Sequence, residues 1–136
     1  MKYPVEIRSK DHCAIITIDG PFSVDSYMTA FSGMVAHPDW MPLFDLIVII
    51  STRSDFNDTN LAKLLVLRDA MRSVNPQHRS GANPRTAIVC TNELKRVIAD
   101  LWLALLDTDW PIALRIFITL DEALAWLADP ADGMGP

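Results

Sequence analysis

Apolar and polar residues follow two periods along this chain, one typical of strands and one typical of helices. Residues 3–8 alternate weakly, and residues 13–19 are rich in β-branched side chains and bounded by turn formers, which predicts an N-terminal hairpin. From Ser23, a candidate N-cap, apolar residues recur at the spacing of one helix face. This helix should end at His37, because Pro38 disfavours helical geometry in the residue before it.

Three apolar runs in the rest of the chain predict further strands. They cover residues 43–50, 85–91 and 112–118. The first run is nearly continuous, as expected for a strand in the middle of a sheet that is covered on both faces. The segment 75–84 contains two Asn-Pro pairs and predicts a turn-rich loop.

Helices are predicted between and after these strands. One begins at Asp58 and Thr59, where either residue can cap the first amide groups, and another covers residues 93–106. A last helix begins at Thr119, whose spacing from Glu122 is that of a capping box.

The resulting order, β-β-α-β-α-β-α-β-α, predicts an α/β fold. We expect a single mixed, mostly parallel five-stranded sheet with an antiparallel N-terminal hairpin and about four helices, because helical crossovers make successive strands parallel. A chain of 136 residues fits one compact domain, which we place at residues 1–129. Residues 130–136 are expected to be a flexible tail.

Charge and composition argue against several classes of function. Twelve basic and seventeen acidic side chains give a net charge of -5, which disfavours nucleic acid and anionic membrane surfaces as partners. The chain has no apolar run long enough to span a bilayer and no signal-peptide pattern at its start, so we expect a cytoplasmic protein without integral membrane association.

No pattern in the chain predicts a cofactor, a metal ion or a catalytic residue. Cys13 and Cys90 lie in strand-like runs without metal or redox spacing, so two buried free thiols are expected. Glycine-rich phosphate loops and histidine pairs at zinc spacing are absent from the sequence. Cys90 precedes a predicted helix N-terminus, a setting that can lower a thiol pKa, and it is the one candidate for an enzyme nucleophile.

Three segments give the chain a resemblance to a known family. These are "HPDWMP" before the third strand, "RTAIVC" as the fourth strand and "IFITLDEALAWL" at the end. Together with the element order, they resemble the SpoIIAA-like or STAS family of anti-sigma-factor antagonists and related small bacterial proteins. The resemblance implies a non-enzymatic regulatory or protein-interaction module.

The resemblance also suggests a phosphorylation site. Antagonists of this family are phosphorylated on a serine that follows an aspartate in a D-S-S/T-G motif at the start of the second helix, and Asp58 and Thr59 match that pair in place and type. Asn60 follows where the family has further motif residues, and the family's glycine is missing before Leu61. Thr59 is therefore a candidate phosphorylation site, and the alternative interpretation is a helix cap alone.

Polar residues are expected at the carboxyl ends of the parallel strands, where open α/β sheets bind ligands. These strand-end residues could hold a small anion, although each could equally be a cap or a turn former. They are Ser51, Thr52, Arg53, Asp58, Thr91, Asn92 and Thr119.

The helix over 93–106 carries more apolar residues than one sheet face covers. A core stripe is expected at Leu94, Val97, Ile98, Leu101 and Leu105. Trp102, Leu103 and Leu106 extend the apolar arc, which predicts an interface with another protein, in the first place a second copy in a homodimer. Two alternatives are a deep core and a cavity for a lipid or other small apolar ligand. A carrier or sensor for a small anionic or apolar, lipid-like ligand is therefore the second function hypothesis, and an enzyme using Cys90 is the third.

Overall fold

The computed structural model describes residues 3–79, 84–106 and 110–129 and shows the predicted α/β fold. The strands are β1 Val5–Arg8, β2 Cys13–Ile18, β3 Asp45–Ile50, β4 Arg85–Cys90 and β5 Ala113–Phe117. The helices are α1 Val24–Val35, α2 Leu61–His78, α3 Glu93–Leu105 and α4 Leu120–Ala128, and a 3-10 turn, Ser9–Asp11, joins β1 to β2. The predicted tail, 130–136, lies outside the described residues.

The five strands form one sheet in the order β1-β2-β3-β4-β5. β1 pairs with β2 antiparallel and the other neighbours are parallel, as the hairpin and the helical crossovers predicted. β3 lies in the middle, with Val48 beside Ile16 on one side and Ile88 on the other. Its continuous apolar run is therefore explained by neighbours on both edges and helices on both faces.

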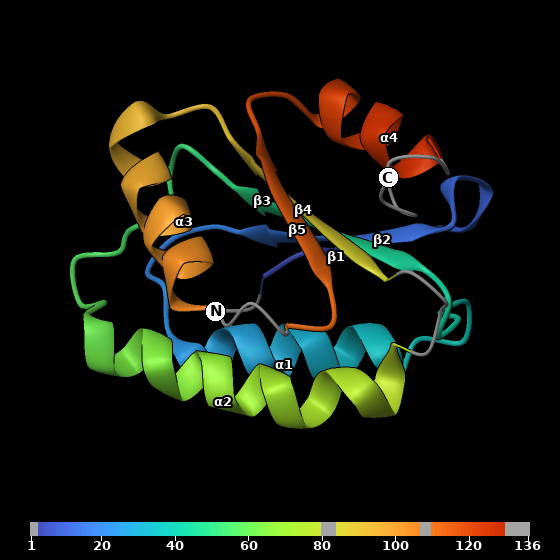
Figure 1. Cartoon of the computed structure of the whole chain (residues 1–136), viewed down its shortest axis with the longest axis horizontal. Helices are drawn as coiled ribbons and strands as arrows, with labels where there is room; N and C mark the ends of the chain where they lie inside the picture. The colour runs from blue at the N-terminus through green and yellow to red at the C-terminus, as the bar shows by residue number, and fades with distance from the viewer. Residues whose placement is uncertain (1–2, 80–83, 107–109, 130–136) are drawn as a thin grey trace.

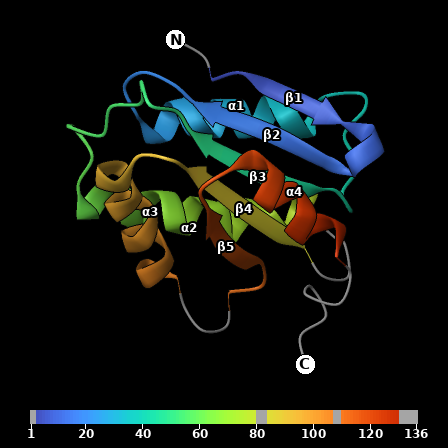
Figure 2. The same cartoon turned by 90° about the horizontal axis from the view of Figure 1, so that it is seen from above.

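Alternate residues of the central strands supply two separate cores. Ile16, Val48 and Ile88 pack in a cluster with residues of α1, α2 and α3, whereas Ile15 and Ile47 pack with α4. Figures 1 and 2 show α1 and α2 side by side on one side of the sheet and α4 on the other. Consecutive parallel strands joined by right-handed crossovers place all connecting helices on the same face, so that among the described helices only α4 covers the second face.

The helix N-termini are capped by short polar side chains. Ser23 accepts from the amide of Ser26 as predicted, and Thr119 and Glu122 form the predicted capping box. α2 begins later than predicted, because its N-cap is Asn60, whose side chain accepts from the Lys63 amide at 2.9 Å. Asp58 and Thr59 therefore precede the helix and do not cap it.

The prediction of a loop from residue 75 is wrong, since α2 continues through Pro76 to His78. Proline removes one backbone hydrogen bond from a helix, so this last turn needs other contacts. The side chain of Asn75 is buried against the sheet, and the ring of His78 packs edge-on against Phe31 at 6.2 Å. The Arg79 amide also donates to the Asn75 carbonyl, which closes the helix end.

The side of α3 that faces the core also differs from the prediction. Leu94 and Val97, expected in the core stripe, are 84% and 62% exposed, whereas Ala99 is buried. Ile98, Ala99 and Trp102 form the side that faces the sheet. The small side chain of Ala99 allows the helix backbone to approach the strands closely, which no larger residue of this helix would permit.

Candidate functional site

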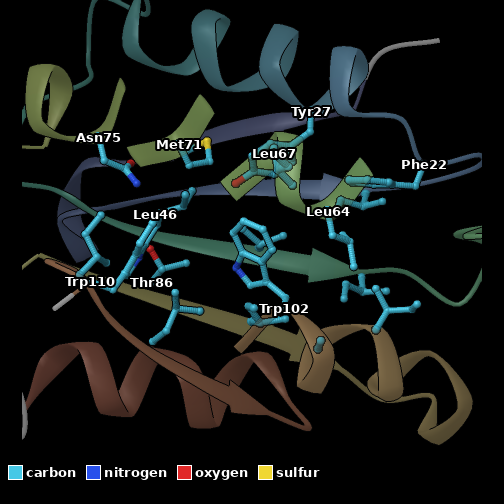
Figure 3. A pocket seen from close by; sticks show the side chains of 18 of the residues that line it. Phe22, Tyr27, Leu46, Leu64, Leu67, Met71, Asn75, Thr86, Trp102 and Trp110 are labelled. Atoms are coloured by element: carbon cyan, nitrogen blue, oxygen red, sulfur yellow. The ribbon is translucent and has the colours of Figure 1, made fainter. Parts of the chain in front are cut away.

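A cavity of about 90 Å³ lies between the sheet and helices α1, α2 and α3. Its walls are almost entirely apolar, and Figure 3 shows side chains from both layers around it. Trp102 of α3 and Trp110 before β5 are both half-buried and line it. The exposed Arg72 of α2 lies with its guanidinium 5.3 Å from the centre of the Trp110 ring and covers it from outside.

The cavity extends along the strands. Leu46 and Thr86, paired at the start of β3 and β4, line one end, and Ile18 and Ile50, paired at the ends of β2 and β3, line the other. In Figure 3, Asn75 and Thr86 lie toward the first end, and Phe22 and Leu64 toward the second. The two ends differ in chemistry, because the first end carries the polar groups.

Four residues from three elements and one helix terminus form this polar end. Tyr27 belongs to α1, Asn75 to the last turn of α2, Arg79 to the residue after α2, and Thr86 to β4. Asn75 and Arg79 are only 4% and 5% exposed. Two strongly polar side chains are therefore removed from water beside an apolar space.

Arg79 is a buried cation held by neutral acceptors. Its Nη1 donates to Thr86 Oγ1 and its Nη2 to the Arg85 carbonyl, both at 2.6 Å. Its Nε has no hydrogen-bond partner among the described residues. Burial lowers the pKa of Arg79 to about 10, and the charges of Asp45 and Tyr27 act in the opposite direction. The guanidinium therefore remains charged at neutral pH.

The closest acidic candidate, Asp45, is already engaged elsewhere. Its Oδ1 accepts from the Arg85 amide at 3.0 Å, and its Oδ2 lies 3.7 Å from Arg85 Nη2. Burial raises the pKa of Asp45, while the Arg85 contacts lower it. Arg79 forms no ion pair with a carboxylate in the described part of the chain.

Tyr27 and Asn75 are also left without partners. Neither side chain makes a hydrogen bond to a described residue, and the Asn75 Oδ1 is fully buried. Burial raises the pKa of Tyr27 to about 12, so its hydroxyl keeps its proton near neutral pH. The polar end thus offers a cation and two neutral hydrogen-bonding groups, which can bind a ligand but include no activated nucleophile.

The strand-end residues predicted from the sequence are occupied by local contacts. Ser51 donates to Asp19 Oδ1 at 3.0 Å, and Arg53 pairs with Asp19 at 2.6 Å, so this carboxylate, which the sequence did not indicate, neutralises Arg53. Asn92 caps α3 and Thr119 caps α4. The remaining ones are dispersed in turns: the carbonyls of Thr52 and Asp58 accept from Lys95 and Lys63, and Thr91 is exposed.

Thr59, the candidate phosphorylation site, lies half-buried in the loop before α2. Its hydroxyl oxygen is buried and has no partner in the described structure. A kinase could reach this oxygen only after the loop opens. Phosphorylation of Thr59 stays a prediction.

Neither cysteine has the environment of a reactive thiol. Burial raises the pKa of Cys13 to about 11, and burial also raises that of Cys90, whose thiol donates to the Asn92 carbonyl at 3.3 Å. A nucleophilic cysteine needs the opposite shift. Among residues 3–79, 84–106 and 110–129, no three metal-binding side chains gather at one place, and no helix is long and apolar enough to cross a membrane.

The predicted interface residues do not lie on the exposed side of α3. Trp102, Leu103 and Leu106 are all half-buried, and Trp102 lines the cavity. The exposed apolar side of this helix carries Leu94 and Val97 instead. Homodimer formation stays a prediction.

Comparisons with protein-family models, curated proteins and solved structures find no match for this chain. The resemblance to SpoIIAA-like proteins therefore stays a prediction from its sequence segments. The site described here was also missed by sequence reasoning, except for Trp102 and the general expectation of a cavity. Asn75 and Arg79 fell in a segment predicted to be a loop, and no periodicity in it indicated their burial.

Proposed function

We propose that this protein is a non-enzymatic binding module, a sensor or carrier, that holds a small and largely apolar molecule in the cavity between the sheet and helices α1–α3. The observation that carries the proposal is Asn75, an amide 4% exposed in the cavity wall and without a hydrogen-bond partner in the described structure. Small-molecule sites typically combine apolar walls with a few polar groups of this kind.

The energetic cost of this arrangement supports a role in binding. A buried polar group without a partner destabilises a fold by about 1–3 kcal/mol, and native proteins contain few of them. A leucine at position 75 would avoid that cost. Retaining the amide is explained if a ligand completes its hydrogen bonds.

This proposal moves the ligand from the place predicted by sequence. The strand-end residues would have bound an anion at the carboxyl ends of the strands, but Arg53 is paired with Asp19 and Asn92 caps a helix. Asn75, whose Oδ1 has no donor in the described structure, and Arg79, which has no carboxylate partner there, lie toward the amino-terminal ends of β3 and β4. The proposed ligand would thus lie between the sheet and helices α1–α3 and not at the carboxyl ends of the strands.

The test is an NMR titration of the ¹⁵N-labelled chain with 1-pentanol. We expect saturable shifts of amides around the cavity, and we expect them to disappear in Leu67→Trp, which adds bulk to the cavity from α2. Leu61→Trp, the same change at an exposed position of α2, is the matched control and should bind as the unaltered chain does. An unaltered chain whose cavity amides do not respond would overturn the proposal.

A protein-interaction module is the second candidate, because Leu94 and Val97 form an exposed apolar side of α3. The partner proposed for it is a second copy of this chain. Val97→Glu should convert a dimer into a monomer in sedimentation experiments, whereas Thr29→Glu on the exposed side of α1 should not. A chain that sediments as a monomer before substitution rules out the homodimer.

For Thr59, intact-mass analysis of protein from its own host would show a phosphate, and a uniformly unmodified residue would count against that role.

A further inference from the structure

We infer that the polar end of the cavity is a carboxylate site and that the ligand is a short aliphatic carboxylic acid. Its carboxylate would lie against Arg79 and Asn75, within reach of the Tyr27 hydroxyl, and its chain along the apolar walls. This inference rests on the proposed function, because it names the class of molecule that the same cavity binds.

The first argument is charge. Arg79 is 5% exposed, and both of its hydrogen bonds go to neutral oxygens, those of Thr86 and of the Arg85 backbone. Buried charges in proteins are normally paired, because an isolated one loses its hydration without compensation. Asp45 is bonded to Arg85, so a ligand carboxylate would supply the missing counter-charge.

The second argument is hydrogen bonding. An ionised carboxylate only accepts hydrogen bonds and has about four sites for them. The Nε of Arg79 is a buried donor without a partner in the described structure. The protonated Tyr27 hydroxyl and the Asn75 Nδ2 also make no hydrogen bond to a described residue, and both can donate, whereas the Asn75 Oδ1 is an acceptor. Bonds from a guanidinium to a carboxylate are charge-assisted and stronger than bonds between neutral groups. An alcohol or an amide of the same length would lack this contribution.

The third argument is size. A cavity of roughly 150 Å³ is known to admit benzene, so about 90 Å³ suits a molecule with on the order of four to six non-hydrogen atoms. Butanoate has six such atoms, so this corresponds to an acid of about that length, and pentanoate, with one carbon more, is at the upper limit. A fatty acid with a long chain would need Trp102 or Leu64 to move out of the wall.

The experiment is a calorimetric titration of the full chain with four probes: pentanoate, its uncharged isostere pentanamide, 1-pentanol and dodecanoate. We expect pentanoate to bind at least tenfold more tightly than pentanamide. Arg79→Met keeps an apolar stem but removes the charge, and should reduce pentanoate affinity at least tenfold while changing pentanamide affinity less than threefold.

A second variant covers the case in which Arg79→Met does not fold. Asn75→Asp has almost the same shape and places a carboxylate of the protein's own beside Arg79. It should reduce pentanoate affinity at least tenfold more than it reduces 1-pentanol affinity, because only the acid is repelled by the new carboxylate.

The outcomes separate the two proposals. If 1-pentanol binds but pentanoate binds no more tightly than pentanamide, the carboxylate site is wrong and the binding module stands. If no probe binds, both are wrong. If dodecanoate binds more tightly than pentanoate, the ligand is a long-chain fatty acid and the assignment of a short acid is overturned.

Discussion

Replacing Asn75 by leucine should make this protein more stable. The amide lies in the last turn of α2, is 4% exposed, and has a buried oxygen without a hydrogen-bond donor in the described structure. Leucine removes the cost of an unpaired buried amide, and its branched end fits among the apolar neighbours of the cavity. From these costs we expect the free energy of unfolding to rise by about 1–3 kcal/mol.

Urea denaturation followed by far-UV circular dichroism measures this change. The midpoint should rise with the slope unchanged, which identifies a change in stability and not in the compactness of either state. Ser73→Leu is the control on the same helix, since Ser73 is exposed. It should change the free energy of unfolding by no more than about 0.5 kcal/mol, through helix propensity alone.

Two results would contradict this reasoning. One is an Asn75→Leu protein less stable than the unaltered chain, which would mean that the amide has partners after all. The other is a gain no larger than that of Ser73→Leu. If Asn75→Leu is more stable and also loses pentanoate binding, then Asn75 lowers the stability of the fold and supports ligand binding, a trade-off common at functional sites.

Three further predictions concern other parts of the fold. Thr119→Ala removes the capping box of α4 and should reduce the free energy of unfolding in urea by about 0.5–2 kcal/mol. Arg85→Met should reduce it by about 3 kcal/mol or more, because the guanidinium donates to three carbonyls at the end of α4 and pairs with Asp45; a loss below about 1 kcal/mol would contradict this. Stability should also fall as the pH rises from about 9 toward 11, since burial raises the pKa of Cys13 to about 11 and of Tyr27 to about 12, and the unfolded chain loses these protons first. Above about pH 10 the fall should flatten, because burial lowers the pKa of Arg79 to about 10 and the unfolded chain keeps that proton longer. In urea titrations across this range, Cys13→Ala should reduce the loss, and Cys90, whose pKa burial also raises, should account for part of what is left.

The strands and most helix starts could be predicted because their signals are local. The continuous run at 43–50 indicated a central strand, observed as β3, and the relation of Thr119 to Glu122 specified the start of α4. Each signal depends on residues close together in sequence, so tertiary contacts do not alter the type or the position of these elements. The α2 cap differed by one or two residues because three successive residues, Asp58, Thr59 and Asn60, can all accept a helix amide hydrogen bond, and only the backbone decides among them.

The orientation of α3 could not be predicted from its pattern. Apolar residues occur all around this helix, so Leu94 with Val97 and Ile98 with Trp102 give equally good stripes. Ala99 decides the orientation in the structure, because its small side chain allows close contact with the sheet. A sequence scan that favours large apolar residues gives such an alanine too little weight.

The polar end of the cavity could not be predicted from the sequence either, for a different reason. Arg79 follows a proline-containing segment in a hydrophilic stretch, where a charged residue is normally exposed. Its guanidinium donates to the Thr86 hydroxyl and to the Arg85 carbonyl, and no spacing in the sequence links Arg79 to these two residues. Tyr27 lies on the buried side of α1, and its hydroxyl has no hydrogen bond to a described residue, which depends on distant elements that the sequence pattern does not place.

The position of α4 has a consequence for biosynthesis. This nine-residue helix follows all five strands in the chain and is the described element that covers Ile15, Ile47 and Val89. While the ribosome is still adding residues beyond β5, the sheet can assemble strand by strand, but the apolar face that α4 later covers stays exposed to solvent. We expect chaperones to bind the nascent chain most readily in that interval. Arg85 of β4 can then donate its hydrogen bonds to the carbonyls of α4 as soon as this helix forms.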